Sequence, residues 1–118
     1  MEKDKKIVAV VGSRGIAKCT ALAARLAELA PDQVVSGGAA GVDGLAAAWA
    51  QANGVPLLEL RPDYATHGPT AATHVRNAEI VKRATLVLVV WDGKSKGTLS
   101  ALKAARRLGR RCELLPLD

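Results

Sequence analysis

Short apolar runs alternate along the 118-residue chain with longer stretches in which apolar positions recur at helical spacing. A continuous run of Val, Ile and Leu is typical of a strand that is covered on both faces of a sheet. The runs predict strands at 7–11, 33–36, 56–60, 86–91 and 111–115, of which 86–91 is the most hydrophobic and the best candidate for a central strand. The intervening stretches predict helices at 16–30, 43–53, 70–83 and 98–108, and the turn formers of 61–69 predict a loop.

Strands that alternate with helices at this spacing form βαβ units, which build a parallel sheet. We therefore expect one α/β domain over residues 1–118, a Rossmann-like doubly wound fold with about five mainly parallel strands and helices on both faces. The charged segment 1–6 is expected to be a flexible tail. In such sheets the ligand crevice lies at the carboxyl ends of the strands, near the point where the strand order switches.

Three glycine-bearing segments, 12–14, 36–43 and 92–98, each follow a predicted strand. Glycine lets backbone N–H groups approach a ligand closely, and a helix that begins nearby directs the positive end of its dipole to the same place. All three segments fall at carboxyl ends of strands, so they predict one shared site for a phosphate or similar anion. The predicted ligand-binding residues are Gly12, Ser13, Arg14, Ser36, Gly37, Gly38, Ala39, Gly41, Asp43, Arg76, Asn77, Asp92, Gly93, Ser95, Gly97 and Thr98.

Each polar residue of these segments also has a purely structural alternative. Arg14 suits bidentate phosphate binding or simple solvation, and Asp43 suits ribose hydroxyls or a helix cap. The third segment is typical of an anion nest, or of a solvated turn in which Thr98 is the N-cap. Arg76 and Glu79 share a helix face, where the ordinary alternative is a surface ion pair.

Several other site types are not indicated. Neither the GxGxxG dinucleotide fingerprint nor the GxxxxGK(S/T) phosphate loop occurs. His67 and His74 lack the partners and spacing of a metal site, and no metal or separate cofactor is predicted. Cys19 and Cys112 form no metal-binding or CxxC spacing, so both are expected to be reduced and buried.

The net charge of +6 suits a nucleic-acid partner. The distribution of the charge along the chain weakens this interpretation. Much of the charge lies in the tail and around the end of the last predicted helix, where cations complement the helix dipole. Aromatic residues make up 3% of the chain, which leaves few rings to stack on bases. No apolar stretch approaches the ~20 residues of a membrane span, so a cytoplasmic protein without a membrane partner is expected.

The three glycine segments, together with Arg76-Asn77 and Trp91-Asp92, resemble in their joint order the SLOG superfamily. This Rossmann-like group contains the DNA-processing protein DprA and the Lonely Guy (LOG) phosphoribohydrolases. The chain is most similar to the small stand-alone YspA/YpsA-like branch, over nearly its whole length. The resemblance implies a nucleotide or nucleotide-derived ligand in the crevice, in a homodimer or higher homo-oligomer.

One departure from the LOG pattern concerns catalysis. LOG enzymes carry a PGGxGTxxE motif, and alignment on Gly97-Thr98 puts residues 93–95 where Pro-Gly-Gly would be and Ala101 at the glutamate. An oxocarbenium-like transition state needs a nearby carboxylate, which Ala101 does not supply. Whether the protein is an enzyme is therefore left open.

Three functions follow from these observations. The leading hypothesis is a module that binds a nucleotide or nucleotide-derived ligand as a sensor or accessory domain. The second is a nucleoside monophosphate phosphoribohydrolase that uses Arg76 with a displaced carboxylate, for which Glu79, Asp92 and Asp43 are the candidates. The third is a DprA-like binder of single-stranded nucleic acid.

Overall fold

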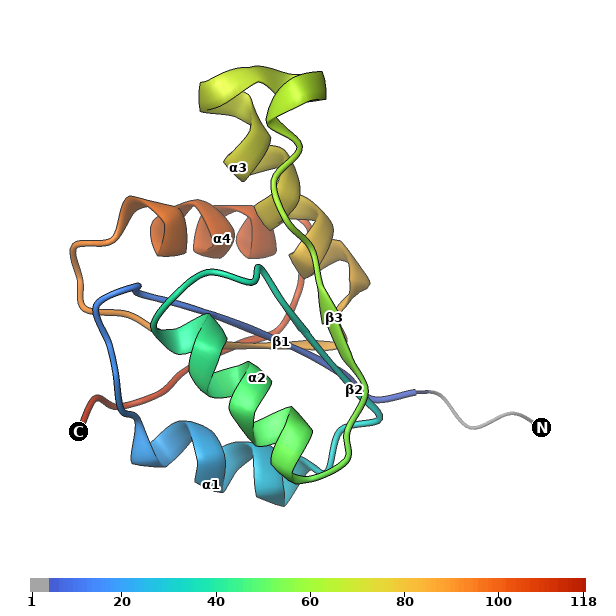
Figure 1. Ribbon diagram of the computed structural model, residues 1–118, viewed down its shortest axis with the longest axis vertical. Coiled ribbons are helices and arrows are strands. Elements are labelled where there is room, and N and C mark those ends of the chain that lie inside the picture. The colour runs from blue at the N-terminus through green and yellow to red at the C-terminus, as the bar shows by residue number, and fades with distance from the viewer. Residues whose placement is uncertain (1–4) are drawn as a thin grey trace.

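The computed structural model describes residues 5–118, and these form a five-stranded parallel sheet between two layers of helices (Figure 1). The strands, in the spatial order β3-β2-β1-β4-β5, are β1 (Ile7–Gly12), β2 (Gln33–Ser36), β3 (Leu57–Glu59), β4 (Leu86–Val90) and β5 (Cys112–Leu114). The helices that alternate with them are α1 (Thr20–Leu29), α2 (Val42–Ala52), α3 (Tyr64–Arg83) and α4 (Lys96–Arg107). This arrangement confirms the predicted doubly wound α/β fold.

The sheet is covered by α1 and α2 on one face and by α3 and α4 on the other (Figure 1). Because side chains alternate along a strand, Val10 of β1 packs toward α1 and α2 whereas Ala9 packs toward α3 and α4. All of β4 is buried, as expected for a strand that lies between two others. The middle of the sheet is nevertheless β1 rather than the more hydrophobic β4.

The strand order switches direction at β1. β2 and β3 are added on one side of it, and the chain then returns to place β4 and β5 on the other. The register pairs Gly12 with Val90, so the last residues of β1 and β4 lie side by side at the carboxyl edge of the sheet. This is the position at which doubly wound folds bind ligands.

Helix α1 begins at Thr20 rather than at position 16. Its N-cap residue, Cys19, provides no side-chain hydrogen bond. Instead the carboxylate of Asp118 accepts hydrogen bonds from the backbone N–H of Thr20 at 2.7 Å and from its hydroxyl at 3.0 Å. A distant residue therefore satisfies a helix end that local sequence leaves without a cap.

Helix α3 begins at Tyr64, inside the predicted loop. Asp63 caps its first turn by accepting hydrogen bonds from the backbone N–H of Thr66 at 3.1 Å and from the Thr66 hydroxyl at 2.7 Å. Gly68, with φ 81° and ψ 175°, then interrupts the helix before Pro69. The first turn consequently projects beyond the body of the protein at the top of Figure 1.

Two smaller expectations were wrong. Helix α4 begins at Lys96 and its N-cap is Ser95, whose hydroxyl accepts from the backbone N–H of Thr98 at 3.3 Å, so Thr98 is not the cap. Cys19 is buried as expected, but Cys112 is exposed. The reason is that β5 is short and lies at the edge of the sheet.

The predicted tail, 1–6, falls partly outside the described residues, since these begin at residue 5. Within them, the backbone N–H of Lys6 donates to the Asp32 carboxylate at 2.6 Å, and its side-chain amine donates to the Leu29 carbonyl at 2.7 Å. Over residues 5–118, no helix has the length and apolar character needed to cross a membrane.

Candidate functional site

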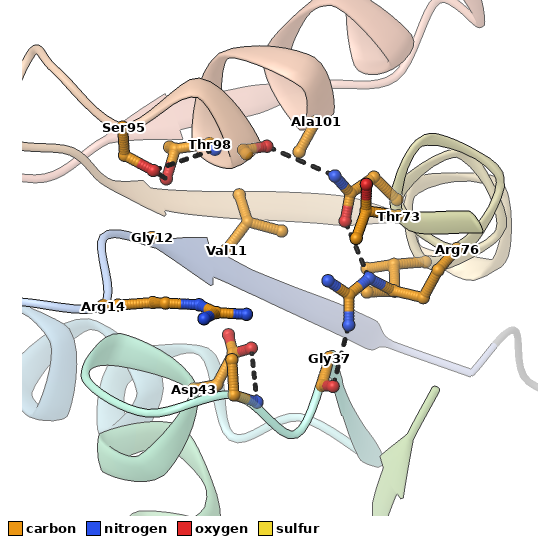
Figure 2. A pocket seen from close by; sticks show the side chains of 14 residues that line it. Val11, Gly12, Arg14, Gly37, Asp43, Thr73, Arg76, Ser95, Thr98 and Ala101 are labelled. Atoms are coloured by element: carbon orange, nitrogen blue, oxygen red, sulfur yellow. Dashed lines mark hydrogen bonds between the residues drawn. The ribbon is translucent and has the colours of Figure 1, made fainter. Parts of the chain in front are cut away.

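A cavity of about 320 Å³ opens at the carboxyl edge of the sheet, where β1 ends (Figure 2). Four parts of the chain wall it: the end of β1 with the following loop, the β2–α2 loop with the first turn of α2, the middle of α3, and the start of α4 with the residue before it. We term this cavity the crevice. Its lining residues are Val11, Gly12, Arg14, Gly37, Ala39, Asp43, Thr73, Arg76, Asn77, Ile80, Ser95, Gly97, Thr98 and Ala101.

Arg76 reaches from α3 across the crevice to the β2–α2 loop (Figure 2). Its Nη1 donates to the carbonyls of Gly37 at 2.9 Å and Leu60 at 3.3 Å, and its Nε donates to the Asn77 side-chain oxygen at 2.8 Å. Burial lowers the pKa of Arg76, whereas the nearby Asp43 carboxylate opposes that change; a guanidinium nevertheless stays protonated. No partner is recorded for Nη2 among the described residues, so Arg76 keeps free donors.

The surface ion pair considered for Arg76 and Glu79 does not form. Glu79 instead lies 3.8 Å from Arg83, one turn further along α3, and both side chains are about half exposed. Arg76 therefore belongs to the crevice, while Glu79 lies outside its wall.

Asp43 lies in the first turn of α2, directly after the glycine-rich β2–α2 loop. It is 8% exposed, and its Oδ2 accepts a hydrogen bond from the backbone N–H of Ala39 at 3.1 Å. The N–H of Gly37 also serves this carboxylate, and Arg76 is close enough to attract it. Burial raises the pKa of Asp43, and these N–H groups and Arg76 limit the rise. The Ala39 N–H, which the sequence assigned to a phosphate, is thus already directed at an internal carboxylate.

Two glycines of this loop lie very close to neighbouring groups. A Cβ at Gly37 would lie 2.5 Å from Nη1 of Arg76 and 3.0 Å from Oδ2 of Asp43. A Cβ at Gly41, which has φ 73°, would collide with the carbonyl of Arg14 in the loop after β1. These glycines bring the first two predicted segments and α3 into contact.

The third segment is organised by Asp92. Its Oδ1 accepts from the backbone N–H groups of Lys94 at 2.8 Å and Ser95 at 2.9 Å, and these bonds lower its pKa. Its own N–H donates to the Ser13 hydroxyl at 3.0 Å, which ties this loop to the end of β1. Asp92 is exposed and is not part of the crevice wall, so it shapes the loop rather than facing the cavity.

The N-terminus of α4 keeps open donors. Ser95 caps the N–H of Thr98, but the N–H groups of Lys96 and Gly97 have no recorded acceptor within residues 5–118. Gly97 lines the crevice, and a Cβ there would meet nothing within 4 Å. These two backbone donors of α4 are therefore open to an anion at the crevice.

Most of the predicted ligand-binding residues line the crevice. Those that do not are Ser13, Ser36, Gly38, Gly41, Asp92 and Gly93. Ser13 and Asp92 link two loops, Gly38, Gly41 and Gly93 have positive φ in turns, and Ser36 is buried with no hydroxyl partner among the described residues.

Four lining residues were not among the predicted ligand-binding residues: Val11, Thr73, Ile80 and Ala101. Thr73 and Ile80 lie three residues before and four after Arg76, which is the spacing of one helix face and a usable signal. Together with Ala101, which is 1% exposed, Val11 and Ile80 give the crevice an apolar wall. The crevice thus combines an apolar wall, two arginines, one carboxylate and a helix N-terminus.

The crevice suits an anionic group more than a metal ion. Its only carboxylate among the described residues is Asp43, and no group of three or more His, Cys, Asp or Glu side chains within residues 5–118 is placed to hold a metal. Arg14 extends into the cavity beside Asp43, opposite Ser95 and Thr98 (Figure 2). Arginine and helix N-terminal N–H groups together are a common phosphate-binding combination.

Comparison with solved structures finds a protein with a similar fold. The X-ray structure of DNA processing protein A (DprA) from Streptococcus pneumoniae superposes with a TM-score of 0.71 at 21% sequence identity. The match covers 97% of this chain and 51% of that one, so the chain spans about half the length of this relative. At this identity the likeness concerns the fold.

Sequence comparison is more specific. A search of the curated proteins finds no match. The profile of the YAcAr family, described as the YspA, cpYpsA-related SLOG family, matches residues 6–67, which is more than half of the chain. This region includes β1, the β2–α2 loop and Asp43. The chain therefore belongs to the YspA, cpYpsA-related SLOG family, within the superfamily that its glycine segments resemble.

Proposed function

We propose that the protein binds a nucleotide or nucleotide-derived phosphate ligand in the crevice, as a sensor or accessory module. The observation that carries the proposal is the meeting of Arg14, Arg76 and the open N-terminus of α4 around one cavity. Its volume of about 320 Å³ lies at the lower end of the range for small-molecule sites, which favours one nucleoside phosphate over a dinucleotide.

The ligand's phosphate belongs at the α4 N-terminus. The N–H of Gly97 is open there, and Arg14 and Nη2 of Arg76 supply cationic donors. Asp43 disfavours a phosphate next to itself, since both carry negative charge. As an acceptor, it suits the hydroxyls of a ribose. The apolar wall of Val11, Ile80 and Ala101 leaves room for an uncharged part of the ligand.

The comparisons support a nucleotide-related role in a general way. The chain belongs to an SLOG family, and its fold is shared with a protein named for DNA processing. Neither comparison identifies a ligand, so the choice of a nucleoside phosphate rests on the size and charge of the crevice.

Calorimetric titration tests the proposal. The panel contains nucleoside mono-, di- and triphosphates, ADP-ribose and cyclic nucleotides. A hydrogen bond to a charged group contributes about 1.5–3 kcal/mol, so Arg76→Ala is expected to weaken binding at least about tenfold. Arg83→Ala is the matched control, because Arg83 is a half-exposed arginine on the same helix outside the crevice. Binding of no panel member, or equal binding by both variants, contradicts the proposal.

One observation favours a hydrolytic alternative. Asp43 is a buried carboxylate beside Arg76 with a raised pKa, as is common for catalytic carboxylates. In this alternative Asp43 serves as the displaced carboxylate while water adds to the sugar carbon and the base departs with a proton. Incubation with nucleoside monophosphates decides between the two: free base formed by the wild type and not by Asp43→Asn favours hydrolysis, and no base above background at high protein concentration excludes it.

A further inference from the structure

A second hollow lies on another face of α4, away from the crevice. It has a volume of about 530 Å³ and is bounded by α3 and α4. We term it the α4 groove. Its lining residues are His74, Lys96, Leu99, Ser100, Lys103, Ala104 and Arg107, none of which lines the crevice.

The groove lies in the segment that carries the charge excess of the protein, and three of its lining residues are cations. Residues 93–112 contain seven of the 17 Lys and Arg residues and none of the 11 Asp and Glu residues, whereas the rest of the chain holds ten cations and eleven acids. Within residues 5–118, the recorded ion pairs include none of Lys96, Lys103 and Arg107. These cations are therefore available to an outside partner.

The helix dipole does not explain this arrangement. Cations in the last turn of a helix are stabilised by the dipole, which accounts for Arg107. Lys96 lies in the first turn of α4, where the same dipole disfavours a positive charge. A solvated helix end, which the sequence suggested for these cations, therefore explains Arg107 but not Lys96.

The centre of the groove is apolar. Leu99 is 36% exposed, and Lys96 and Lys103 lie three residues before and four after it on the same face. The stripe from Lys96 to Arg107 is about 16 Å long. His74 of α3 borders it, with its Nδ1 2.7 Å from the Ser100 hydroxyl oxygen. An apolar anchor point flanked by cations at helical spacing is the complement of an amphipathic acidic helix.

We propose that the α4 groove docks an acidic amphipathic segment of a partner protein. An apolar side chain of the segment packs on Leu99, and its carboxylates face Lys96, Lys103 and Arg107. A nucleic acid fits less well, because the groove lining has no Phe, Tyr or Trp ring on which a base would stack. The exposed Leu99 would also lie against phosphates, with which an apolar side chain makes no favourable contact. A second copy of the chain fits less well because two faces of the same sign repel. This docking goes beyond ligand binding in the crevice and does not depend on it.

Peptide display tests the proposal. Random peptides of about 15 residues, long enough to span the groove as a helix, are selected on the wild-type protein after pre-clearing on Lys103→Glu/Arg107→Glu. The expected winners combine several Asp or Glu residues with an apolar residue at helical spacing. Their affinity, measured by fluorescence polarisation, is expected to fall as salt rises from about 0.05 to 0.3 M.

Variants distinguish the groove from general charge attraction. Lys103→Glu/Arg107→Glu and, separately, Leu99→Ser are each expected to weaken the selected peptide at least about tenfold. Lys5→Glu/Lys18→Glu makes the same charge change at exposed positions elsewhere and is expected to leave binding nearly unchanged. Circular dichroism confirms folding, and Lys103→Gln/Arg107→Gln replaces the charge reversal if that variant does not fold.

The proposal is overturned if no peptide is enriched, if the enriched peptides lack an acidic excess, or if the groove variants bind them as the wild type does. It is also overturned if no peptide binds while a single-stranded oligonucleotide binds the wild type, loses affinity in the charge variant and is unaffected by Leu99→Ser.

Discussion

Replacing Gly37 by alanine tests how far ligand binding depends on the position of the Arg76 guanidinium in the crevice. The new Cβ would lie 2.5 Å from Nη1 of Arg76, 2.9 Å from its Cζ and 3.0 Å from Oδ2 of Asp43. Carbon and nitrogen atoms in comfortable contact are about 3.5 Å apart, so the guanidinium must move by roughly 1 Å. Its 2.9 Å bond to the Gly37 carbonyl is then lost. Because the guanidinium is the mobile end of a long side chain, the backbone has no need to shift.

The cost follows from that single displacement. A hydrogen bond to a charged group contributes about 1.5–3 kcal/mol, and Arg76 recovers part of it by turning toward solvent. We expect the free energy of unfolding to fall by about 1–2 kcal/mol, which lowers Tm by roughly 4–8 °C for a domain of this size. Affinity for the crevice ligand is expected to fall about 10- to 100-fold, since Arg76 is no longer positioned across the cavity.

Differential scanning calorimetry and ligand titration measure the two effects. Gly44→Ala is the matched control: a Cβ there meets nothing within 4 Å, and alanine within a helix is expected to add about 0.5–1 kcal/mol of stability without changing affinity. In an Arg76→Ala background, Gly37→Ala should have little further effect, because the group it displaces is gone. Wild-type affinity in Gly37→Ala, or additive effects in the double variant, would show that the new Cβ does not act by displacing Arg76.

The remaining predictions concern a cap and two carboxylates. Ser95→Ala removes the side-chain cap of α4 and is expected to cost about 1 kcal/mol by chemical denaturation; an unchanged midpoint would contradict the capping role. The bonds to Thr20 lower the pKa of Asp118, so its carboxylate stabilises the protein above its unfolded pKa and loses that contribution as pH falls through the folded pKa. The Tm difference between wild type and Asp118→Asn should therefore shrink from about pH 5 to pH 2, and a constant difference would argue against it. Burial raises the pKa of Asp43, so its ionisation costs stability as pH rises from the unfolded pKa of about 4 through the folded value. Asp43→Asn removes this titration and should give a flatter dependence of Tm on pH between about pH 4 and 7. Parallel Tm profiles of the two proteins would count against this role of Asp43.

The sequence predicted the sheet and the position of the crevice for the same reason. Continuous apolar runs are typical of buried parallel strands, and the residue types that end those runs also shape the loops at the carboxyl edge. Gly12, Gly37 and Gly97 therefore meet around one cavity although they are far apart in the chain. Thr73 and Ile80 could also have been predicted from the sequence, because helical spacing places them on the same helix face as Arg76.

Other features depend on contacts that no local pattern records. The start of α1 is fixed by Asp118, which is 98 residues from Thr20 in the chain. Arg76 had an acidic neighbour at pairing distance along its helix, yet it bonds to the carbonyls of Gly37 and Leu60. In each case the partner comes from a distant segment, so tertiary packing rather than local spacing decides the contact.

The carboxylate of Asp43 has a consequence for how the crevice responds to its ligand. A glycine-rich loop without an internal anion pays conformational entropy when a ligand orders it, and the affinity is reduced accordingly. Here the N–H of Ala39 is already bonded to Asp43, and Arg76 is anchored to the Gly37 carbonyl of the same loop. The loop is thus preorganised before any ligand arrives. We expect its backbone amides to show similar hydrogen-exchange protection in the free and ligand-bound protein, with the change on binding confined to the start of α4.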